Sequence, residues 1–277
     1  MDNHLLLIEC PDQPGLIWNV TGAMYRRGFN VVSNHEFVDR ETGRFFMRTE
    51  FTGTDPAGVV PEIEALLPSE ARVRLARTGD RRIVVLVTRE AHCLGELLLR
   101  HSTGDLGARI LSVVGNHATL APLATRFDVP FRHVASEGLT REEHEARIAA
   151  TIDEFEPEFL VLAKYMRVLS AAFVTRYANR SINIHHSFLP AFRGANPYRQ
   201  AFERGVKIIG ATAHFVTADL DEGPIIAQSV IPTDHSQGPE AMAQAGRDVE
   251  KIVLARALRL VFEERVFLVG NRTIVFE

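Results

Sequence analysis

The sequence has 277 residues, of which 46% are hydrophobic and 24% charged, so the chain is long enough to bury one large core or two smaller ones. Its net charge of −4 and its scattered Lys and Arg exclude the basic surface typical of nucleic-acid binding and favour a small-molecule partner. The first strand-like stretch has only about six residues and no apolar run reaches about eighteen, so we expect no signal peptide, no membrane span and a cytoplasmic protein.

The two cysteines, Cys10 and Cys93, lie far apart in the sequence and lack the spacing of a metal site. Cys10 ends an apolar stretch and is expected to be buried at the end of a strand. Free thiols of this kind are typical of a reducing compartment, so no disulfide is expected.

The first 77 residues show hydrophobic patterns that switch between the periods of strands and helices. The turn at 11–15 leads into a helix with Leu16, Val20 and Met24 on one face, and Gly28 ends that helix. The order of elements is βαββαβ, which predicts a ferredoxin-like sandwich. We expect strands at 4–10, 31–38, 45–51 and 71–76, the middle two as a hairpin, and helices at 16–27 and 56–67.

Residues 78–82 are polar and charged, and we place a boundary here between a domain at 1–80 and a domain at 81–277. The run at 83–87 is apolar and β-branched throughout, as in a strand buried on both faces. Strands and helices then alternate, which predicts an α/β fold with a doubly wound, mostly parallel sheet. We expect further strands at 110–114, 131–134, 159–163, 224–231, 266–269 and 273–276, and helices at 91–101, 120–127, 141–155 and 239–263.

Two polar residues share one side of a predicted strand end. In the stretch 181–190, isoleucines alternate with Asn183 and His185, so the amide and the imidazole face the same way. Asp221 follows on a turn at 219–224 that contains glycine and proline. An amide stabilises a developing oxyanion, an imidazole exchanges protons near neutral pH, and a carboxylate orients the imidazole and positions a nucleophile. These three residues are a candidate catalytic trio for chemistry at an acyl carbon.

The motifs around these residues resemble those of the formyltransferase-fold enzymes that use 10-formyltetrahydrofolate. The matching stretches are 181–190, Gly-Ala-Asn-Pro-Tyr at 194–198, and 210–217 followed by Gly223 and Pro224. Within that fold the chain is most similar, over essentially its whole length, to the formyltetrahydrofolate deformylase family. The resemblance implies hydrolysis of 10-formyltetrahydrofolate to formate and tetrahydrofolate without a metal or redox cofactor, which supplies formate for purine synthesis and balances one-carbon pools.

The resemblance also implies where the folate binds. The segment 164–169 is similar to the stretch whose backbone binds the pterin ring, and main-chain groups at a strand end match the row of donors and acceptors on that ring. Ser170 is expected to cap the helix that follows. The roles of Lys164 and His186 stay open. The residues expected to contact folate are Met166, Arg167, Val168, Leu169 and, as a direct contact or as packing behind the site, His214.

The N-terminal domain resembles the ACT domain, a small regulatory module that commonly binds amino acids. Because the turn between its first strand and first helix contains a glycine beside helix N–H groups, it suits a small carboxylate. The resemblance implies an amino-acid effector such as glycine or methionine and a homo-oligomer. The alternative is a domain that only packs or dimerises. The expected effector residues are Asp12, Gln13, Pro14 and Gly15.

Two other functions remain open. A formyltransferase would pass the formyl group to an amine, but the loop at 88–94 lacks the glycine-rich phosphate turn that the related glycinamide ribonucleotide transformylase has there. The same absence argues against dinucleotide binding. A catalytically silent folate-binding sensor is opposed by the intact Asn183, His185 and Asp221.

A metal site is a further alternative, because imidazoles and carboxylates suit zinc or iron. Adjacent residues on a strand point to opposite faces, so His185 and His186 are not expected to share one ion. We therefore favour chemistry without a metal. The residues considered as ligands are His185, His186, His214, His235, Asp219 and Asp221.

Overall fold

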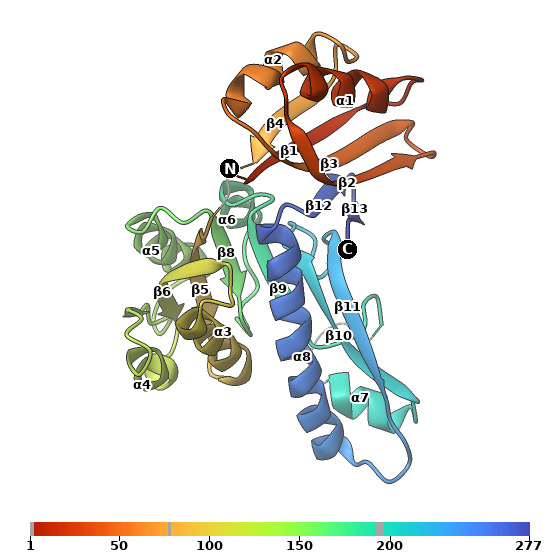
Figure 1. Ribbon diagram of the computed structural model, residues 1–277. Coiled ribbons are helices and arrows are strands. Elements are labelled where there is room, and N and C mark those ends of the chain that lie inside the picture. The colour runs from red at the N-terminus through yellow and green to blue at the C-terminus, as the bar shows by residue number, and fades with distance from the viewer. Residues whose placement is uncertain (1–2, 77–78, 192–196) are drawn as a thin grey trace. The chain divides into compact units, whose positions relative to one another are not determined.

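The structure is a computed structural model that describes residues 3–76, 79–191 and 197–277 (Figure 1). The chain divides into two compact units, one from Met1 to Gly79 and one from Asp80 to Val275. Of the motif expected at 194–198, only the last two residues lie within the described chain, where they begin helix α7 (Pro197–Glu203).

The N-terminal unit is a four-stranded antiparallel sheet with strand order β2-β3-β1-β4. The order βαββαβ is confirmed, and β2 and β3 form the expected hairpin. The core lies between the helices and one face of the sheet, because residues of both helices are buried together with strand residues such as Ile8 and Met47. The elements are β1 (Asn3–Pro11), α1 (Leu16–Arg26), β2 (Asn30–Asp39), β3 (Arg44–Thr52), α2 (Val59–Glu64) and β4 (Arg72–Ala76).

Helix α2 is shorter than the helix expected at 56–67. A 3₁₀ turn, Pro56–Gly58, precedes it, and α2 ends at Glu64. Pro61 lacks an N–H donor and is tolerated only near the start of a helix, and Pro68 disfavours helical geometry in the residue before it. The prolines therefore divide this segment.

The second unit contains a seven-stranded sheet with order β11-β10-β9-β8-β5-β6-β7. The strands from β7 to β9 are parallel, and β10 and β11 are antiparallel, which confirms a mostly parallel, doubly wound sheet. No helix in the described chain has the length and apolar character needed to cross a membrane. The strands are β5 (Arg81–Val87), β6 (Ala108–Gly115), β7 (Phe131–His133), β8 (Phe159–Leu162), β9 (Ser181–His185), β10 (Ile208–Phe215), β11 (Ile225–Pro232), β12 (Val266–Val269) and β13 (Arg272–Val275), and the helices besides α7 are α3 (His92–Thr103), α4 (Ala121–Thr125), α5 (Arg141–Asp153), α6 (Ala171–Arg176) and α8 (Pro239–Phe262).

Strand β5 lies inside this sheet, between β8 and β6, and is buried on both faces. Val85 and Val87 pack with residues of α3 and α8, whereas Val84 and Leu86 pack with residues of α5 and α6. This confirms the interpretation of its continuous apolar run. From β5 the chain builds β6 and β7 on one side and then β8 and β9 on the other. The crevice outside the carboxyl ends of β5 and β8 is therefore the topological switch point, where open α/β sheets bind ligands.

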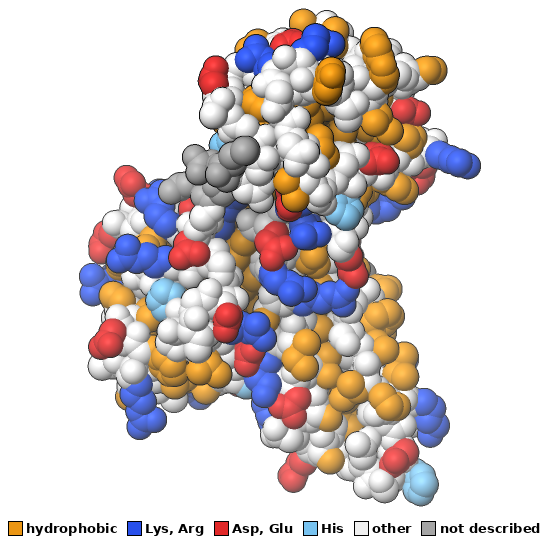
Figure 2. Space-filling model, viewed as in Figure 1, with side chains coloured by type: hydrophobic (Ala, Val, Ile, Leu, Met, Phe, Trp, Pro, Cys, Tyr) orange, Lys and Arg blue, Asp and Glu red, His pale blue; other side chains and the backbone are white. Residues whose placement is uncertain are grey.

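Basic and acidic side chains are interspersed on the face shown in Figure 2. Blue Lys and Arg side chains lie beside red Asp and Glu side chains, and the described part of this face shows no single basic patch.

Candidate active site

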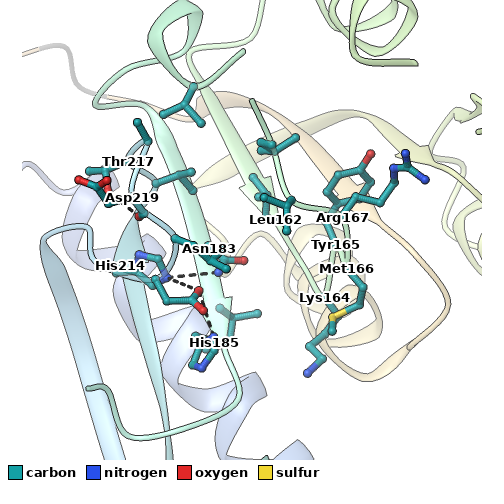
Figure 3. A pocket seen from close by; sticks show the side chains of 18 of the residues that line it. Leu162, Lys164, Tyr165, Met166, Arg167, Asn183, His185, His214, Thr217 and Asp219 are labelled. Carbon is teal, nitrogen blue, oxygen red and sulfur yellow. Dashed lines mark hydrogen bonds and ion pairs between the residues drawn. The ribbon is translucent and has the colours of Figure 1, made fainter. Parts of the chain in front are cut away.

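A cavity of about 330 Å³ lies at the carboxyl ends of β8 and β9, beside the end of β10 (Figure 3). Its walls come from the segment after β8, the end of β9, and the turn after β10. Residues far apart in the sequence thus meet at one edge of the sheet. All residues expected from the sequence for catalysis or for folate contact line this cavity, namely Asn183, His185, Asp221, Met166, Arg167, Val168, Leu169 and His214.

His185 is the last residue of β9, and its side chain is buried. Its Nδ1 lies 3.2 Å from Oδ1 of Asp221. A carboxylate only accepts hydrogen bonds, so Nδ1 carries the proton and Nε2 of the neutral ring is free of one. This buried Nε2 has no hydrogen-bond partner among the described residues. The arrangement leaves one basic nitrogen in the cavity wall, ready to accept a proton.

Asp221 is held in place by a tight turn. Its φ is +57°, in the left-handed region, and the N–H of Phe215 donates to the carbonyl of Pro224 at 2.9 Å to close the turn. A Cβ on Gly223 would lie 1.8 Å from the carbonyl oxygen of Phe215, so only glycine allows this approach. Burial raises the pKa of the Asp221 carboxyl, but the hydrogen bond from His185 and the nearby imidazoles outweigh burial and hold that pKa below its ordinary value. The carboxylate is therefore charged and fixes the imidazole.

Asn183 is oriented by His214 on the neighbouring strand β10. The Nδ1 of His214 donates to the carbonyl of Phe215 at 2.9 Å, so its Nε2 accepts from Nδ2 of Asn183 at 3.2 Å. Burial lowers the pKa of His214, which keeps this ring neutral. The carboxylate of Asp221 lies 3.9 Å from Nε2 of His214, too far for a hydrogen bond. His214 thus positions the amide, and the second N–H of Asn183 is left for a ligand.

The segment after β8 borders the cavity with exposed apolar side chains. Met166 and Val168 are each 55% exposed, and the N–H of Met166 donates to Oγ1 of Thr88. Ser170 caps helix α6 as expected, because its Oγ accepts from the N–H of Phe173 at 3.2 Å. A flat ring bound here would have apolar side chains against its face, as is common in ligand pockets.

His186 also lines the cavity, and its ring centroid lies 4.9 Å from that of His185. The expectation that the two histidines face opposite sides was wrong. Strand β9 ends at His185, so the alternation of side chains along a strand does not continue to the next residue. Burial, together with the positive charge of Lys164, lowers the pKa of His186 to about 3, so its imidazole is neutral.

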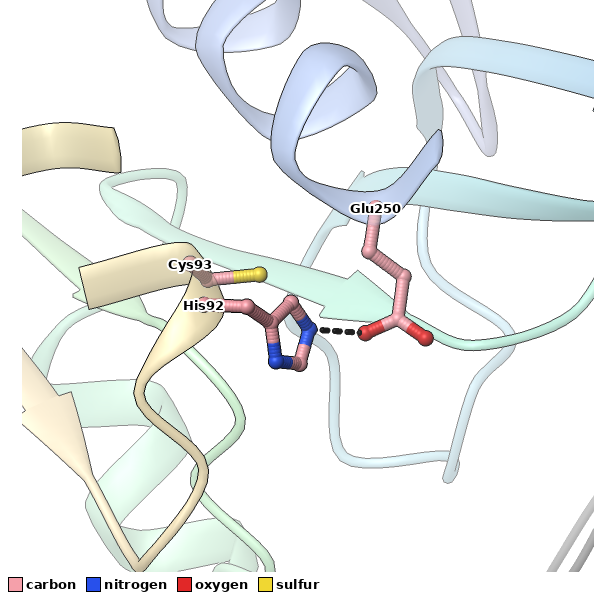
Figure 4. Close-up of side chains that lie close together, drawn as sticks. All are labelled: His92, Cys93 and Glu250. Carbon is pink, nitrogen blue, oxygen red and sulfur yellow. Dashed lines mark hydrogen bonds and ion pairs between the residues drawn. The ribbon is translucent and has the colours of Figure 1, made fainter. Parts of the chain in front are cut away.

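The histidines and aspartates that the sequence offered as metal ligands do not form a compact ligand set among the described residues. Within the described residues, another group has the spacing of metal ligands. It consists of His92, Cys93 and Glu250, whose ligand atoms lie within 4.8 Å of one another (Figure 4). The sequence did not single out this group, because its members come from two helices far apart in the chain.

A doubly wound sheet with this trio at one edge defines an enzyme of the formyl transferase class. Residues 81–258 match the formyl transferase family and residues 4–68 match the ACT domain. The chain is 56% identical to formyltetrahydrofolate deformylase of Escherichia coli K12 over 99% of each chain, and 42% identical to that of Bacillus subtilis over 99% of this chain and 94% of the relative. It belongs to the formyltetrahydrofolate deformylase family.

Solved structures agree with this assignment. The formyltetrahydrofolate deformylase of Burkholderia mallei is 42% identical and superposes with a TM-score of 0.92 over all of both chains. Glycinamide ribonucleotide transformylase 1 of Symbiobacterium toebii is 32% identical, with a TM-score of 0.69. The match covers 72% of this chain and 95% of the transformylase chain. The likeness to deformylases thus spans the whole chain, whereas the likeness to the transformylase covers only part of it.

Proposed function

We propose that this protein hydrolyses 10-formyltetrahydrofolate to formate and tetrahydrofolate. The observation that carries the proposal is the free Nε2 of His185, fixed by Asp221 beside the amide of Asn183. Family membership supplies the substrate, and the cavity supplies groups suited to attack on a formyl carbon.

In the proposed reaction, Asp221 orients His185 and helps to position a water molecule, and Nε2 of His185 removes a proton as the water attacks the formyl carbon. The carbonyl oxygen becomes an oxyanion and accepts a hydrogen bond from the free N–H of Asn183. When the intermediate collapses, the bond between carbon and N10 breaks and His185 returns the proton to N10. The formyl carbon keeps its oxidation state, so the reaction needs no redox cofactor, and we propose that it proceeds without a metal.

The pterin ring is proposed to bind along the segment 166–169. Met166 and Val168 supply apolar contacts, and backbone groups of Arg167 and Leu169 supply hydrogen bonds. We further propose that the reaction supplies formate for purine synthesis and balances one-carbon pools in the cytoplasm. Two free, buried cysteines suit a reducing compartment.

Replacing Asn183 with alanine is expected to lower the rate of formate release by about 10²- to 10³-fold, because losing one oxyanion donor costs about 2.7–4 kcal/mol of transition-state stabilisation. Formate and tetrahydrofolate are measured together, with and without small amines. A folded variant that releases formate at the wild-type rate contradicts the role of Asn183. Amine formylation by the wild type that is saturable and faster than formate release favours a transferase instead.

The N-terminal unit is proposed to bind an amino acid, such as glycine or methionine, and to regulate a homo-oligomer. The match to the ACT domain supports this proposal. Gly15 caps helix α1 with a φ of +90°, and the N–H of Asp12 donates to the carbonyl of Gly43, which holds the turn of residues 12–15 against the β2–β3 hairpin. The turn of Asp12, Gln13, Pro14 and Gly15 is exposed, and we propose that it receives the carboxylate of the amino acid beside the N–H groups at the start of the helix.

Gly15→Ala is expected to weaken amino-acid binding about tenfold, since a side chain at this left-handed position strains the turn that receives the ligand. Calorimetric titration of the full-length protein with the common amino acids measures the binding affinity, and sedimentation analysis measures the oligomeric state. Gly28→Ala is the matched control, because Gly28 also has a positive φ and open space at Cβ but lies at the other end of α1. No binding to the wild type at millimolar concentration reduces this unit to a packing or assembly domain.

A further inference from the structure

The crevice at the topological switch point, outside the carboxyl ends of β5 and β8, holds a group of polar and charged side chains. Glu90 and His92 follow β5, Lys164 follows β8, Tyr198 lies on α7, and Glu250 lies on α8. We name these five residues the crevice cluster. They occupy the place where a sheet of this topology is expected to bind a ligand.

Glu250 is the centre of the crevice cluster, and its side chain is only 1% exposed. Its Oε2 lies 2.7 Å from Nε2 of His92 (Figure 4) and 3.2 Å from Nζ of Lys164. Its Oε1 accepts from the hydroxyl of Tyr198 at 2.7 Å. Glu90 adds a second carboxylate, 3.7 Å from Nζ of Lys164. Both oxygens of Glu250 are thus occupied by groups of the chain itself.

A metal ion does not account for this arrangement, although His92, Cys93 and Glu250 have the spacing of ligands. The ammonium of Lys164 already supplies the positive charge beside Oε2 of Glu250. Burial raises the pKa of the Cys93 thiol far above its ordinary value, which disfavours the thiolate that would bind a metal. The crevice cluster is thus held together by ion pairs and hydrogen bonds among its own side chains.

Lys164 connects the crevice cluster to the active site. Its side chain is 3% exposed, it lines the catalytic cavity, and its φ of +62° is unusual for a residue with a long side chain. The ring of His186 lies between the two regions, with its centroid 4.9 Å from the ring of His185 and 6.3 Å from that of Tyr198. The positive φ of Lys164 is a strained backbone conformation, which persists where surrounding contacts enforce it and is common at functional sites.

We propose that Lys164 and Glu250 close the crevice to a second substrate, so that water and not an amine reaches the formyl group. This inference rests on the proposed hydrolase function and names the residues that set its choice of nucleophile. Water forms a C–O bond to the formyl carbon and displaces N10, and an amine would form a C–N bond and displace N10 in the same way. Unlike water, the amine also carries a substituent, which needs room beside His185. The side chains of the crevice cluster take up the neighbouring crevice, whereas water needs no such space.

The test uses a double variant, Lys164→Gly with Glu250→Gln, in the full chain. Glycine suits the positive φ at 164, and glutamine keeps the shape of Glu250 without leaving an unpaired buried charge. Glycinamide is the amine probe, and N-formylglycinamide and formate are quantified in the same reaction. The variant is expected to raise the ratio of transfer to hydrolysis at least about tenfold over the wild type, because even a small change in the shape of a pocket changes the discrimination between substrates by about this factor.

His92→Ala opens the crevice from the side of β5 and leaves Glu250 paired with Lys164, so it serves as a second variant if the double variant does not fold. The matched control removes a half-buried ion pair of α3 outside the crevice cluster, Arg100→Gly with Glu96→Gln, and is expected to leave the ratio unchanged. An unchanged ratio in the opened variants, or loss of formate release without amine formylation, overturns the inference. A wild type that releases no formate refutes the proposed hydrolase activity separately, whatever the variants do.

Discussion

Replacing His185 with glutamine is expected to slow formate release by about 10²- to 10⁴-fold, the usual contribution of a general acid–base group. Nε2 of His185 is the basic nitrogen that Asp221 leaves free in the cavity wall, and glutamine places no titrating group there. Single-turnover measurement of formate from 10-formyltetrahydrofolate separates this chemical step from product release.

The control for this variant is His235→Gln, which changes an exposed histidine that does not line the cavity. It is expected to keep the wild-type rate. Circular dichroism and thermal melting establish that both proteins are folded. Wild-type formate release by folded His185→Gln protein shows that another group moves the proton.

The features that the sequence predicted best depend on local periodicity. The apolar run at 83–87 indicates a doubly buried strand because each of its residues meets a core on one face or the other. Alternation likewise placed Asn183 and His185 on one side of β9. It failed at His186, because a periodic pattern does not show at which residue the strand ends.

The crevice cluster depends on tertiary structure and could not be predicted in this way. Glu90, Lys164 and Glu250 lie on separate elements and meet only after the sheet and α8 are assembled. One signal was available: Glu250 falls on a helix face whose neighbours Val249 and Val253 are buried in the core. A charged residue on such a face needs a partner, but the sequence does not name that partner.

Asp221→Asn is also expected to lower the rate of formate release by about 10²- to 10⁴-fold, through the tautomer of His185. The carboxylate accepts the proton on Nδ1 and so leaves Nε2 free. An amide at 221 can donate its N–H to Nδ1 instead, which favours the ring with its proton on Nε2. The imidazole then has no basic nitrogen toward the water, although the fold of the turn is kept.

The pH dependence of stability distinguishes loss of this charge from general damage. The pKa of Asp221 is lower in the folded state than its ordinary value of 3.8, so its stabilising contribution is complete above that value and is lost as the pH falls through the folded pKa. The free energy of unfolding of Asp221→Asn should therefore lie below that of the wild type at neutral pH, and the difference should shrink as the pH falls below 3.8. Glu222→Gln, an exposed change on the same turn, is the control and should keep the wild-type rate of formate release. A stability difference that stays constant down to acid pH, or an Asp221→Asn protein with full activity, contradicts the role of the carboxylate in fixing His185.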